Sequence, residues 1–273
     1  MTDVILVSTD WLALREEADG RSRSRRLARA VGRRVDGPLV VHDLGSGTGS
    51  MMRWLAPLLP GPQTWVLHDW NGELLEAAAS VPAFDSRGDH VRVIKSVEHF
   101  EHLRPDHLAG ASLVTASALL DVLTQDEVEA IVAACVEAGA PAFLSLTVTG
   151  RVRIEPADPG DRVFEAAFKD HQRRVEDGRR LLGPDAVEAA VEAFTAAGWG
   201  TRVAGSGWRL GASDRALADE WLTGWVGAAV EQRPALAEWA DEYLQNRRRQ
   251  ISAGELHAIV HHADLLAFPP SAP

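Results

Sequence analysis

The fold is decided by Pro38-Leu-Val-Val-His-Asp-Leu-Gly-Ser-Gly-Thr-Gly-Ser50, an apolar, strand-like run that leads into a glycine-rich turn. The glycines stand at positions 45, 47 and 49, and a helical pattern follows over residues 50–59. Glycine has no Cβ and adopts positive φ at little cost, so such a turn lets backbone approach a ligand closely. The helix N-terminus behind it offers unpaired N–H groups to an anionic group. This stretch therefore predicts a strand, a ligand-binding turn and a helix.

Short apolar runs and helical patterns alternate along the next hundred residues. Further strands are expected at 64–69, 90–94, 111–116 and 142–148, with helices that include 71–79 and 124–138. Thr124, with Glu127 three residues later, is a capping-box pattern that marks a helix start. Strands that alternate with helices form a parallel sheet covered on both faces. The sequence therefore predicts an α/β fold.

The regular alternation breaks after Gly150. Residues 151–181 are polar and rich in arginine, and the later pattern predicts a helix at 185–197, a strand at 201–210, two helices within 214–250 and a last strand at 257–268. We expect a Rossmann-like, mostly parallel seven-stranded sheet flanked by helices, with helical lid insertions. The expected organisation is a single domain, 1–273, with an N-terminal helical cap (11–34), a core (38–150), a lid insertion (151–181) and a helical insertion before the last strand (214–250).

Composition excludes several classes of protein. The chain of 273 residues has 28 basic and 39 acidic residues, a formal charge of −11, which argues against nucleic acid as a partner. The single cysteine, Cys135, cannot form an internal disulfide and is expected in the core. No apolar run is long enough to span a membrane, and the first ten residues lack the basic segment of a signal peptide. We expect a cytoplasmic protein with no membrane partner.

The spacing of the glycines separates two kinds of nucleotide site. A dinucleotide-binding fingerprint would place its third glycine at position 50, where this chain has Ser50. The observed form is D-x-G-x-G-x-G, which begins at Asp43. Asp69 ends the second predicted strand, twenty residues after Gly49, where a carboxylate can accept both hydroxyls of a ribose. A helix N-cap is the alternative role for Asp69.

The run Asp43-Leu-Gly-Ser-Gly-Thr-Gly49, followed by Val66-Leu-His-Asp69, resembles the class I S-adenosylmethionine-dependent methyltransferases. Three further stretches resemble an actinobacterial subfamily of small-molecule methyltransferases: Trp11–Asp19, Thr115–Asp121 and His171–Arg174. The resemblance implies S-adenosyl-L-methionine as the cofactor and covers residues 11 to 268. It also implies where the cofactor would lie along the chain.

By this resemblance, Gly45, Ser46 and Gly47 run beneath the methionine part, and Asp69 holds the ribose beside Trp70 or Asn71. Ser96 and Val97 match the loop that meets the adenine, with the usual acid displaced to Glu98. An arginine of the N-terminal helix would pair with the cofactor's carboxylate; Arg23 is preferred over Arg15 and Arg21. The cofactor set predicted in this way is Arg23, Asp43, Gly45, Ser46, Gly47, Gly49, Asp69, Trp70, Asn71, Ser96, Val97, Ala116 and Ser117.

Catalytic residues are harder to place, because methyl transfer from an activated donor needs position more than a fixed motif. The N-methyltransferase tetrapeptides of the [ND]-P-P-[YF] type are absent after the fourth strand. Two candidate bases remain: Asp121, just after that strand, and His171, in the polar lid. Each also has an alternative role without catalysis: Asp121 could be a turn carboxylate, and His171 an exposed residue of the lid.

Three other features of the sequence could form metal or substrate sites. The tail Glu255–Asp264 contains three histidines, but strand geometry gathers no three ligands on one face, so no metal is expected. Trp208 or Trp225 could line an apolar substrate pocket, although core packing is the simpler interpretation. Arg151, Arg153, Arg173 and Arg174 could clamp an acidic substrate or form a solvated surface, and Arg247-Arg-Arg249 is interpreted as a solvated helix end.

The function expected is transfer of a methyl group from S-adenosylmethionine to an oxygen or nitrogen of a small metabolite. Two alternatives stay open: an NAD(P)-dependent oxidoreductase, and a non-catalytic S-adenosylmethionine-binding module. Partners other than the small-molecule substrate are not expected, and the chain could be a monomer or a homodimer.

Overall fold

The computed structural model describes residues 8–98 and 104–270, and its strands form one large sheet and one small hairpin. The strands are β1 (Leu39–Leu44), β2 (Gln63–Asp69), β3 (Arg92–Val97), β4 (Leu113–Ser117), β5 (Ala142–Glu155), β6 (Val175–Glu176), β7 (Arg179–Arg180), β8 (Gly200–Gly205), β9 (Trp208–Leu210) and β10 (His257–Phe268). The large sheet has the order β3-β2-β1-β4-β5-β10-β8, and β9 also pairs with β10.

The sheet is mostly parallel, as predicted. Strands β1 to β5 are parallel to one another, and β10 is antiparallel to both β5 and β8. The expected strand at 201–210 is wrong in one respect, because it is two strands separated at Ser206 and Gly207. The Ser206 N–H donates to the carbonyl of His262 (2.9 Å), where the pairing of β10 with β5 shifts its register. The chain therefore continues along β10 as a separate strand.

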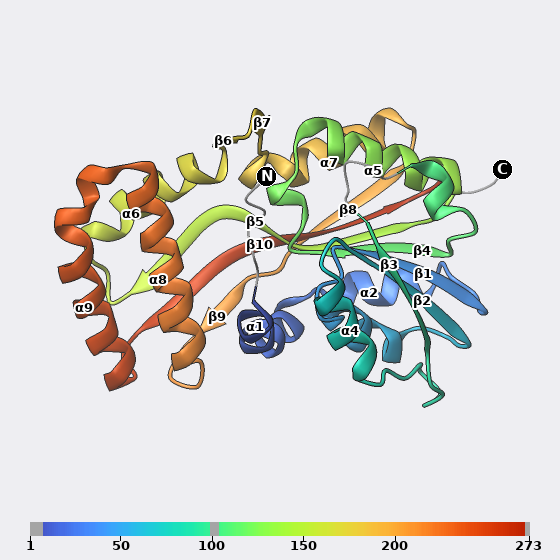
Figure 1. The fold of residues 1–273 in the computed structure, drawn as a ribbon, viewed down its shortest axis with the longest axis horizontal. Helices are drawn as coiled ribbons and strands as arrows, with labels where there is room; N and C mark the ends of the chain where they lie inside the picture. Colours follow the sequence, from blue (N-terminus) through green and yellow to red (C-terminus); the bar gives the residue numbers. More distant parts are fainter. Residues whose placement is uncertain (1–7, 99–103, 271–273) are drawn as a thin grey trace.

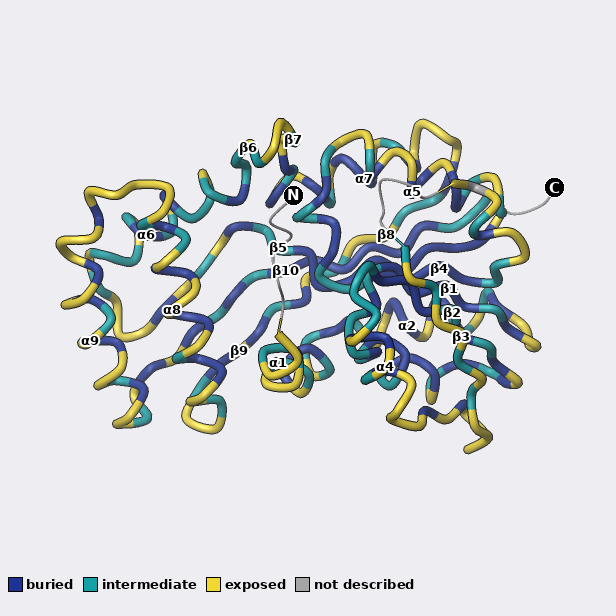
Figure 2. Tube along the Cα trace, viewed as in Figure 1, coloured by how far each residue is buried: buried dark blue, intermediate teal, exposed yellow. Residues whose placement is uncertain are grey.

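The helices are α1 (Thr9–Ser22), α2 (Arg25–Gly32), α3 (Ser50–Leu55), α4 (Gly72–Ser80), α5 (Gln125–Ala138), α6 (Gly160–Gln172), α7 (Ala186–Ala196), α8 (Arg215–Gln232) and α9 (Ala237–Ala253). Helices α5 and α7 cover one face of the sheet, and α2, α3 and α4 lie on the other (Figure 1). The predicted capping box at Thr124 and Glu127 is confirmed at the start of α5. The two apolar layers enclose the central strands, which are buried along most of their length (Figure 2).

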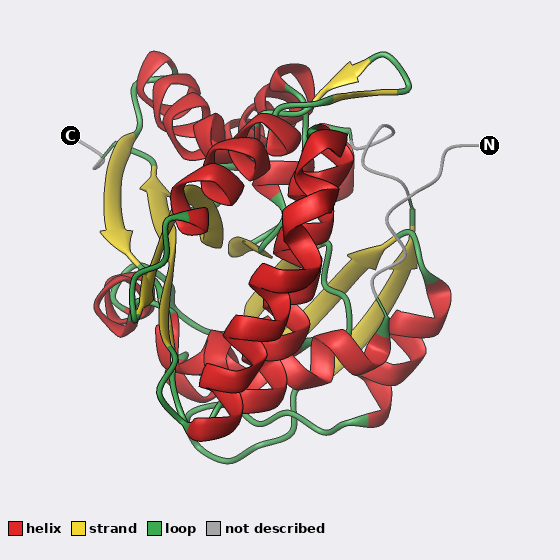
Figure 3. Cartoon of the chain, turned by 90° about the vertical axis from the view of Figure 1, so that its left-hand side faces the viewer, coloured by secondary structure: helices red, strands yellow, loops and turns green. Residues whose placement is uncertain are grey.

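Strands β5 and β10 run on past the other strands and support a second group of helices, α6, α8 and α9, which we call the helical insertion (Figure 1). Figure 3 turns this end of the molecule toward the viewer. Its core is aromatic: Trp225 packs near Phe164, Trp221 and Tyr243. The strand expected to end at Val148 continues to Glu155, so part of the polar 151–181 segment is strand and α6 is helix. The sequence expectation missed that helix.

Buried polar groups also hold the helical insertion together. Arg247, which the sequence suggested would be solvated, is fully buried, so that expectation is wrong. Its guanidinium contacts the Asp161 carboxylate and donates to the Pro156 carbonyl (2.7 Å) and to Gln250 Oε1 (2.8 Å). The Tyr243 hydroxyl donates to the same Asp161 oxygen (2.7 Å). These contacts attach α9 to the loop between β5 and α6.

Two predictions that concern single features can be compared with the fold directly. Cys135 is buried in the core between α5 and the sheet, as predicted, and burial raises the pKa of its thiol to about 12. Among residues 8–98 and 104–270, no helix combines the length and the apolar composition that crossing a membrane requires.

Candidate functional site

The glycine-rich loop lies between β1 and α3, at the carboxyl end of the parallel strands. Gly45 and Gly47 both have positive φ, +61° and +52°, which strains any residue with a side chain. A Cβ at Gly45 would lie 3.0 Å from the Leu119 side chain, and one at Gly47 would lie 3.2 Å from Leu12. The loop is therefore packed against the segment after β4 on one side and against α1 on the other.

Asp69, at the end of β2, attaches this loop to the next strand. Its Oδ2 accepts the Gly47 N–H and its Oδ1 accepts the Asn71 N–H, both at 2.9 Å. Burial raises the pKa of this carboxyl group, while the backbone donors act in the opposite direction. Asn71, not Asp69, is the N-cap of α4. The carboxylate thus lies beside the loop with lone pairs left for further donors, as a ribose would require.

Asp43, at the end of β1, is a buried carboxylate with one free oxygen. The Thr115 hydroxyl donates to its Oδ1 (2.6 Å), whereas its Oδ2 is buried and has no hydrogen-bond partner in the described part of the chain. Burial raises the pKa of Asp43 to about 7. Buried polar atoms are nearly always hydrogen-bonded, so an unpartnered carboxylate oxygen beside a glycine-rich loop indicates a missing donor.

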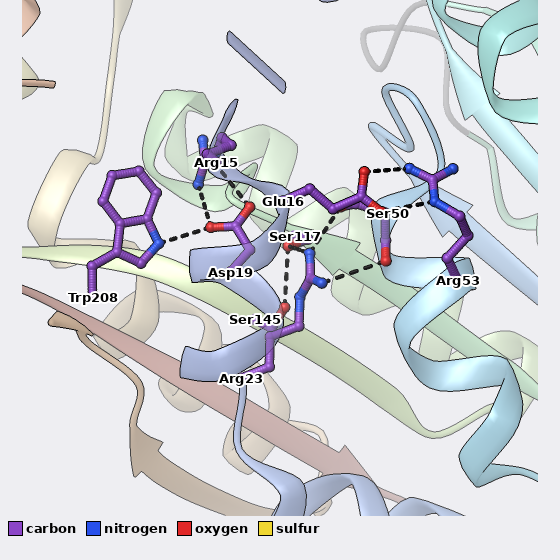
Figure 4. Close-up of polar contacts among 9 residues, drawn as sticks. All are labelled: Arg15, Glu16, Asp19, Arg23, Ser50, Arg53, Ser117, Ser145 and Trp208. Carbon is purple, nitrogen blue, oxygen red and sulfur yellow. Dashed lines mark hydrogen bonds and ion pairs between the residues drawn. The ribbon is translucent and has the colours of Figure 1, made fainter. Parts of the chain in front are cut away.

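Arg23 is the counterpart of Asp43, and it lies in the break between α1 and α2. Its Nη2 donates to the hydroxyls of Ser50 and Ser117, each at 3.0 Å, and the residue is only 3% exposed (Figure 4). Within residues 8–98 and 104–270 it forms no ion pair, and its Nε has no partner. Burial lowers the pKa of Arg23, and the charges of Asp19, Asp43 and Asp264 oppose that effect. A buried cation without a contacting carboxylate is a good receptor for an anionic ligand.

The other two arginines considered for this role already have carboxylate partners. Arg15 forms two hydrogen bonds with Asp19, at 2.9 and 3.3 Å, and its guanidinium lies over the Trp208 ring. Arg21 is exposed and pairs with Glu17 and Asp214. Both are therefore less available than Arg23 to a ligand.

Helix α1 is fastened over the loop by several polar contacts. Arg53 of α3 makes a bidentate pair with Glu16 of α1, at 2.8 and 2.6 Å, and the Trp54 indole donates to the Gly20 carbonyl (2.9 Å). Figure 4 shows Glu16 and Asp19 of α1, and Arg23 directly after it, directed toward neighbouring segments. The N-terminal helix therefore forms one wall of the candidate cofactor site.

The strand next to Asp69 contributes the residues expected near an adenine. Val97 is the register partner of Asp69 and is 65% exposed. Ser96 donates through its hydroxyl to Glu98 Oε1 (2.6 Å), and the same oxygen lies 2.6 Å from Nδ1 of His68. The acid predicted to be displaced to Glu98 is thus engaged by Ser96 and His68, and its other oxygen lies 2.9 Å from Nδ1 of His107. Trp70 is half-buried at the end of β2.

Ala116 and Ser117 end β4 directly beside the loop. Ala116 is the register partner of Leu44, and the Ser117 hydroxyl accepts from Arg23 and from Ser145 (3.3 Å). Ser46 is buried, and its hydroxyl has no partner in the described residues. Gly49, the third glycine, forms the left-handed N-cap of α3. The predicted cofactor residues therefore gather around one edge of the sheet.

The two predicted catalytic residues lie in different surroundings. Asp121 belongs to the short 3-10 turn η4 (Leu120–Val122), and its buried Oδ1 has no partner among the described residues. Burial raises the pKa of Asp121 to about 6, and Arg15 acts in the opposite direction. His171 lies in the last turn of α6, 4.0 Å from Glu231, and burial together with Arg174 lowers its pKa. None of these contacts joins His171 to the glycine-rich loop.

The histidines of the tail do not converge on a metal. His262 donates through Nδ1 to the Val260 carbonyl (2.9 Å), and the Asp264 carboxylate is occupied by other donors. In the ranges 8–98 and 104–270, no three His, Cys, Asp or Glu side chains are placed to bind one ion.

Sequence reasoning missed four residues of this site: Ser50, Thr115, Ser145 and Asp264. In the sequence, Ser50 is identified only as the residue that breaks the dinucleotide fingerprint. In the structure, its hydroxyl accepts a hydrogen bond from Arg23. Asp264 had a usable signal, because it is the only charged residue in the apolar run 258–268 apart from histidines. A charge in a buried strand must have partners, so its position called for an explanation.

Comparisons with known proteins establish the fold. No protein-family model matches the sequence, and no curated protein matches it significantly. Among solved structures, a cyclopropane synthase from Mycobacterium tuberculosis superposes with a TM-score of 0.50 and 12% identity, over 96% of this chain and 94% of its own. A mycolic acid cyclopropane synthase complexed with SAH and CTAB (TM-score 0.47, 14% identity, 89% and 81% covered) is similar. So is a SAM-dependent methyltransferase from Geobacter sulfurreducens in complex with S-adenosyl-L-homocysteine (0.47, 14%, 94% and 98%).

These identities are low, so the likeness concerns architecture and not activity. It covers 96% of this chain. The chain has a methyltransferase-like α/β fold, with a seven-strand, mostly parallel sheet flanked by helices.

Proposed function

We propose that this protein binds S-adenosylmethionine at the glycine-rich loop and transfers its methyl group to an oxygen or nitrogen of a small metabolite. One observation carries the proposal: two buried groups of opposite charge beside the loop lack a partner of opposite charge in contact. Arg23 is bound only by hydroxyl and carbonyl groups, and Asp43 Oδ2 is bound by nothing in the described residues. Together they fit the carboxylate and ammonium groups of an α-amino acid.

The remaining parts of the cofactor would meet the neighbouring residues. Asp69 would hold the ribose hydroxyls, since it already fixes the loop and the start of α4. Trp70 and Asn71 would lie beside the adenine, with Ser96 and Val97 on the adjacent strand. The site thus places an acidic side chain at the sugar, a basic one at the ligand's carboxylate, and a mixture of aromatic, apolar and polar side chains at the base.

A nicotinamide dinucleotide fits this arrangement less well. Its pyrophosphate needs backbone N–H donors and offers no ammonium for the buried Asp43. Ser50 occupies the place of the fingerprint's third glycine, and its hydroxyl accepts from Arg23 instead. The oxidoreductase alternative therefore leaves the buried Oδ2 of Asp43 without a donor.

The cofactor, when bound, supplies an already activated methyl group. The protein would then supply position, exclusion of water and a proton acceptor for the incoming hydroxyl or amine. Asp121 suits the last role, because it follows β4 next to the loop, has a free buried oxygen and has a pKa of about 6. His171 stays a prediction as a second candidate. Trp208 is buried, its indole donates to Asp19 Oδ1 (2.8 Å) and its ring contacts Trp11, so a role as a pocket wall for the acceptor stays a prediction.

Several finer expectations stay predictions. They are the actinobacterial small-molecule subfamily, the cytoplasmic location, the absence of nucleic-acid and membrane partners, and the choice between monomer and homodimer. The acidic net charge of −11 supports a small-molecule acceptor over nucleic acid.

Calorimetric titration with S-adenosylhomocysteine and with NAD tests the proposal. We expect S-adenosylhomocysteine to bind and to raise the thermal midpoint, with about 2.7 kcal/mol of added stability at a hundredfold excess over Kd. Binding of NAD instead would overturn the proposal in favour of an oxidoreductase. Clear S-adenosylhomocysteine binding, without its formation from S-adenosylmethionine across a broad panel of hydroxyl and amine acceptors, would favour the non-catalytic module.

A further inference from the structure

Asp264 is an unusual residue for the middle of a buried strand. It lies in β10 and is 0% exposed. At this position, between Ala263 and Leu265, the pairing of β10 with β5 shifts its register. Burying a carboxylate is costly unless several donors replace its hydration. The arrangement of its donors shows what this residue does for the fold.

Three groups from three separate segments donate to this one carboxylate. Oδ2 accepts the backbone N–H of Ser24 (2.6 Å), and Oδ1 accepts the backbone N–H of Leu146 (2.9 Å) and the Ser206 hydroxyl. The first donor lies between α1 and α2, the second in β5, and the third between β8 and β9. Asp264 therefore joins the N-terminal helices to the sheet.

Both backbone donors directly follow residues of the candidate cofactor site. Ser24 follows Arg23, and Leu146 follows Ser145, whose hydroxyl donates to Ser117 (3.3 Å). Ser117 in turn accepts from Nη2 of Arg23 (3.0 Å; Figure 4). The two oxygens of Asp264 thus hold the two ends of a single chain of side chains, Arg23 to Ser117 to Ser145.

The backbone at both ends is irregular and needs such support. Arg23 has φ −55° and ψ 139°, an extended conformation that ends α1, and Ser24 begins the next helix as its N-cap. Leu146 has φ +55°, a left-handed conformation that a leucine rarely adopts. The left-handed conformation of Leu146 persists when the surroundings fix it, and here Asp264 accepts the N–H of that residue.

The charge of Asp264 acts in addition to its hydrogen bonds. It favours the charged form of the buried Arg23 without touching the guanidinium, as do Asp19 and Asp43. On charge alone, removing Asp264 would strengthen binding of a ligand carboxylate at Arg23. On geometry, removing it would release the segment that carries Arg23 and weaken that binding. The two effects have opposite signs, so an experiment can separate them.

We infer that Asp264 is a positioning residue, which aims Arg23 at the carboxylate of the bound nucleoside amino acid. The inference rests on the proposed function, since it assumes that Arg23 meets that carboxylate. It assigns Asp264 no contact with the ligand, and it explains why a charged residue interrupts an otherwise apolar strand.

The test compares two ligands on Asp264→Asn. S-adenosylhomocysteine carries the amino-acid part, whereas 5′-methylthioadenosine has the same nucleoside without it. We expect calorimetry to show at least about tenfold weaker binding of S-adenosylhomocysteine and little change for methylthioadenosine. A general loosening of the fold would weaken both ligands equally, and a purely electrostatic role would tighten S-adenosylhomocysteine. Either result would overturn the inference.

Asp85→Asn is the matched control. Asp85 is also a buried carboxylate that accepts two backbone N–H groups, from Arg87 (2.8 Å) and Asp89 (3.0 Å), but in the loop before β3. This variant should keep the wild-type ratio of the two affinities. In an Arg23→Ala background, Asp264→Asn should not lower that ratio further, because the group it positions has gone.

Two outcomes concern folding and the proposed function itself. If Asp264→Asn does not fold, Ser206→Ala removes one donor from Oδ1 and should give a smaller loss, again confined to S-adenosylhomocysteine; no selective loss would overturn the inference. If the wild-type protein fails to bind S-adenosylhomocysteine, the proposed function fails. If the wild type binds and the ratio is unchanged in the variants, only the role of Asp264 fails.

Discussion

Two buried arginines, in different parts of the molecule, show how a structural charge differs from one available to a ligand. Arg247 in the helical insertion contacts the carboxylate of Asp161, and its hydrogen bonds raise its pKa even though burial opposes this. Arg23 at the glycine-rich loop contacts only hydroxyl and carbonyl groups, and burial lowers its pKa. Neither Nε has a partner among the residues that the structure describes, so the contacting carboxylate is what separates the two arginines.

A buried charge indicates a ligand site only where no protein group of opposite charge contacts it. The chain provides Arg247 with its own anion, and the pair fastens α9 to the start of α6. It provides Arg23 with acidic neighbours that stabilise its charge but do not touch it. An anion from outside the chain would complete the second site as Asp161 completes the first.

Arg247→Ala gives the largest expected effect, and it is on stability. Removing one partner of a buried pair leaves the other charge uncompensated, so we expect the free energy of unfolding to fall by about 3–5 kcal/mol. Denaturant titration measures this loss. Binding of S-adenosylhomocysteine to the folded fraction should stay at the wild-type level; a selective loss of ligand would show that the helical insertion shapes the cofactor site.

Arg23→Ala gives the next largest effect, and it is on binding. Truncating one member of a buried charge pair typically costs more than 2 kcal/mol, so we expect S-adenosylhomocysteine affinity to fall by about 3 kcal/mol, roughly 150-fold. Stability without ligand should fall far less than in Arg247→Ala, because no carboxylate loses its partner. Unchanged affinity, measured by calorimetry, would remove Arg23 from the carboxylate site and end the contrast between the two arginines.

Much of the half that contains the glycine-rich loop was predictable from the sequence. The strand, glycine turn and helix around residues 38–59 follow from local rules, and so does the carboxylate of Asp69 at the end of the next strand. Local patterns work there because each parallel strand is apolar, short and bounded by a helix. The choice of Arg23 among three arginines came from the resemblance and agrees with its burial, since Arg15 and Arg21 already have partners.

The other half resisted prediction for physical reasons. Helix α6 lies in a polar, arginine-rich segment whose charged residues are exposed or half-buried, so the short apolar face of the helix does not stand out in the sequence pattern. Arg247 stands in a run of three arginines, and only its tertiary contacts with Asp161 and Pro156 explain its burial. At the strand break, the Ser206 hydroxyl donates to Asp264, 58 residues further along the chain, a contact that no local window detects.

Asp69→Ala sharpens the account of the loop, with a smaller effect. The variant loses a hydrogen-bond acceptor for the ribose and also the bond to the Gly47 N–H. We expect binding of S-adenosylhomocysteine to weaken by about 2 kcal/mol, the range for hydrogen bonds to a charged group. Unlike Arg23→Ala, this variant should weaken 5′-methylthioadenosine equally, since both ligands share the ribose. Calorimetry with both ligands checks this, and an effect on one ligand alone would contradict the assignment.

Asp43 gives the smallest expected effect, as a dependence on pH. Burial raises its pKa from 3.8 to about 7, with Arg23 lowering it and Asp69 raising it further. In the free protein, the stability that Asp43 contributes is present below about pH 4 and is lost as the pH rises through 7. A ligand ammonium favours the ionised carboxylate, so affinity for S-adenosylhomocysteine should fall about tenfold from pH 8 to pH 6.

The control for this pH dependence is Asp43→Asn, which cannot ionise. Its affinity for S-adenosylhomocysteine should be lower at pH 8 and nearly flat between pH 6 and pH 8. Binding of 5′-methylthioadenosine, which has no ammonium group, should vary little with pH in either protein. A dependence on pH that persists in Asp43→Asn would assign the titration to another group.

A crystal structure of the protein with S-adenosylhomocysteine tests the central claim most directly. The account predicts the ligand's carboxylate within hydrogen-bond distance of the Arg23 guanidinium, at roughly 2.7–2.9 Å for a charge-assisted bond, with its sugar on Asp69. Two results would contradict it. One is an Arg23 still bound only to Ser50 and Ser117, with the ligand's carboxylate directed to solvent. The other is a pyrophosphate bound at the glycine-rich loop.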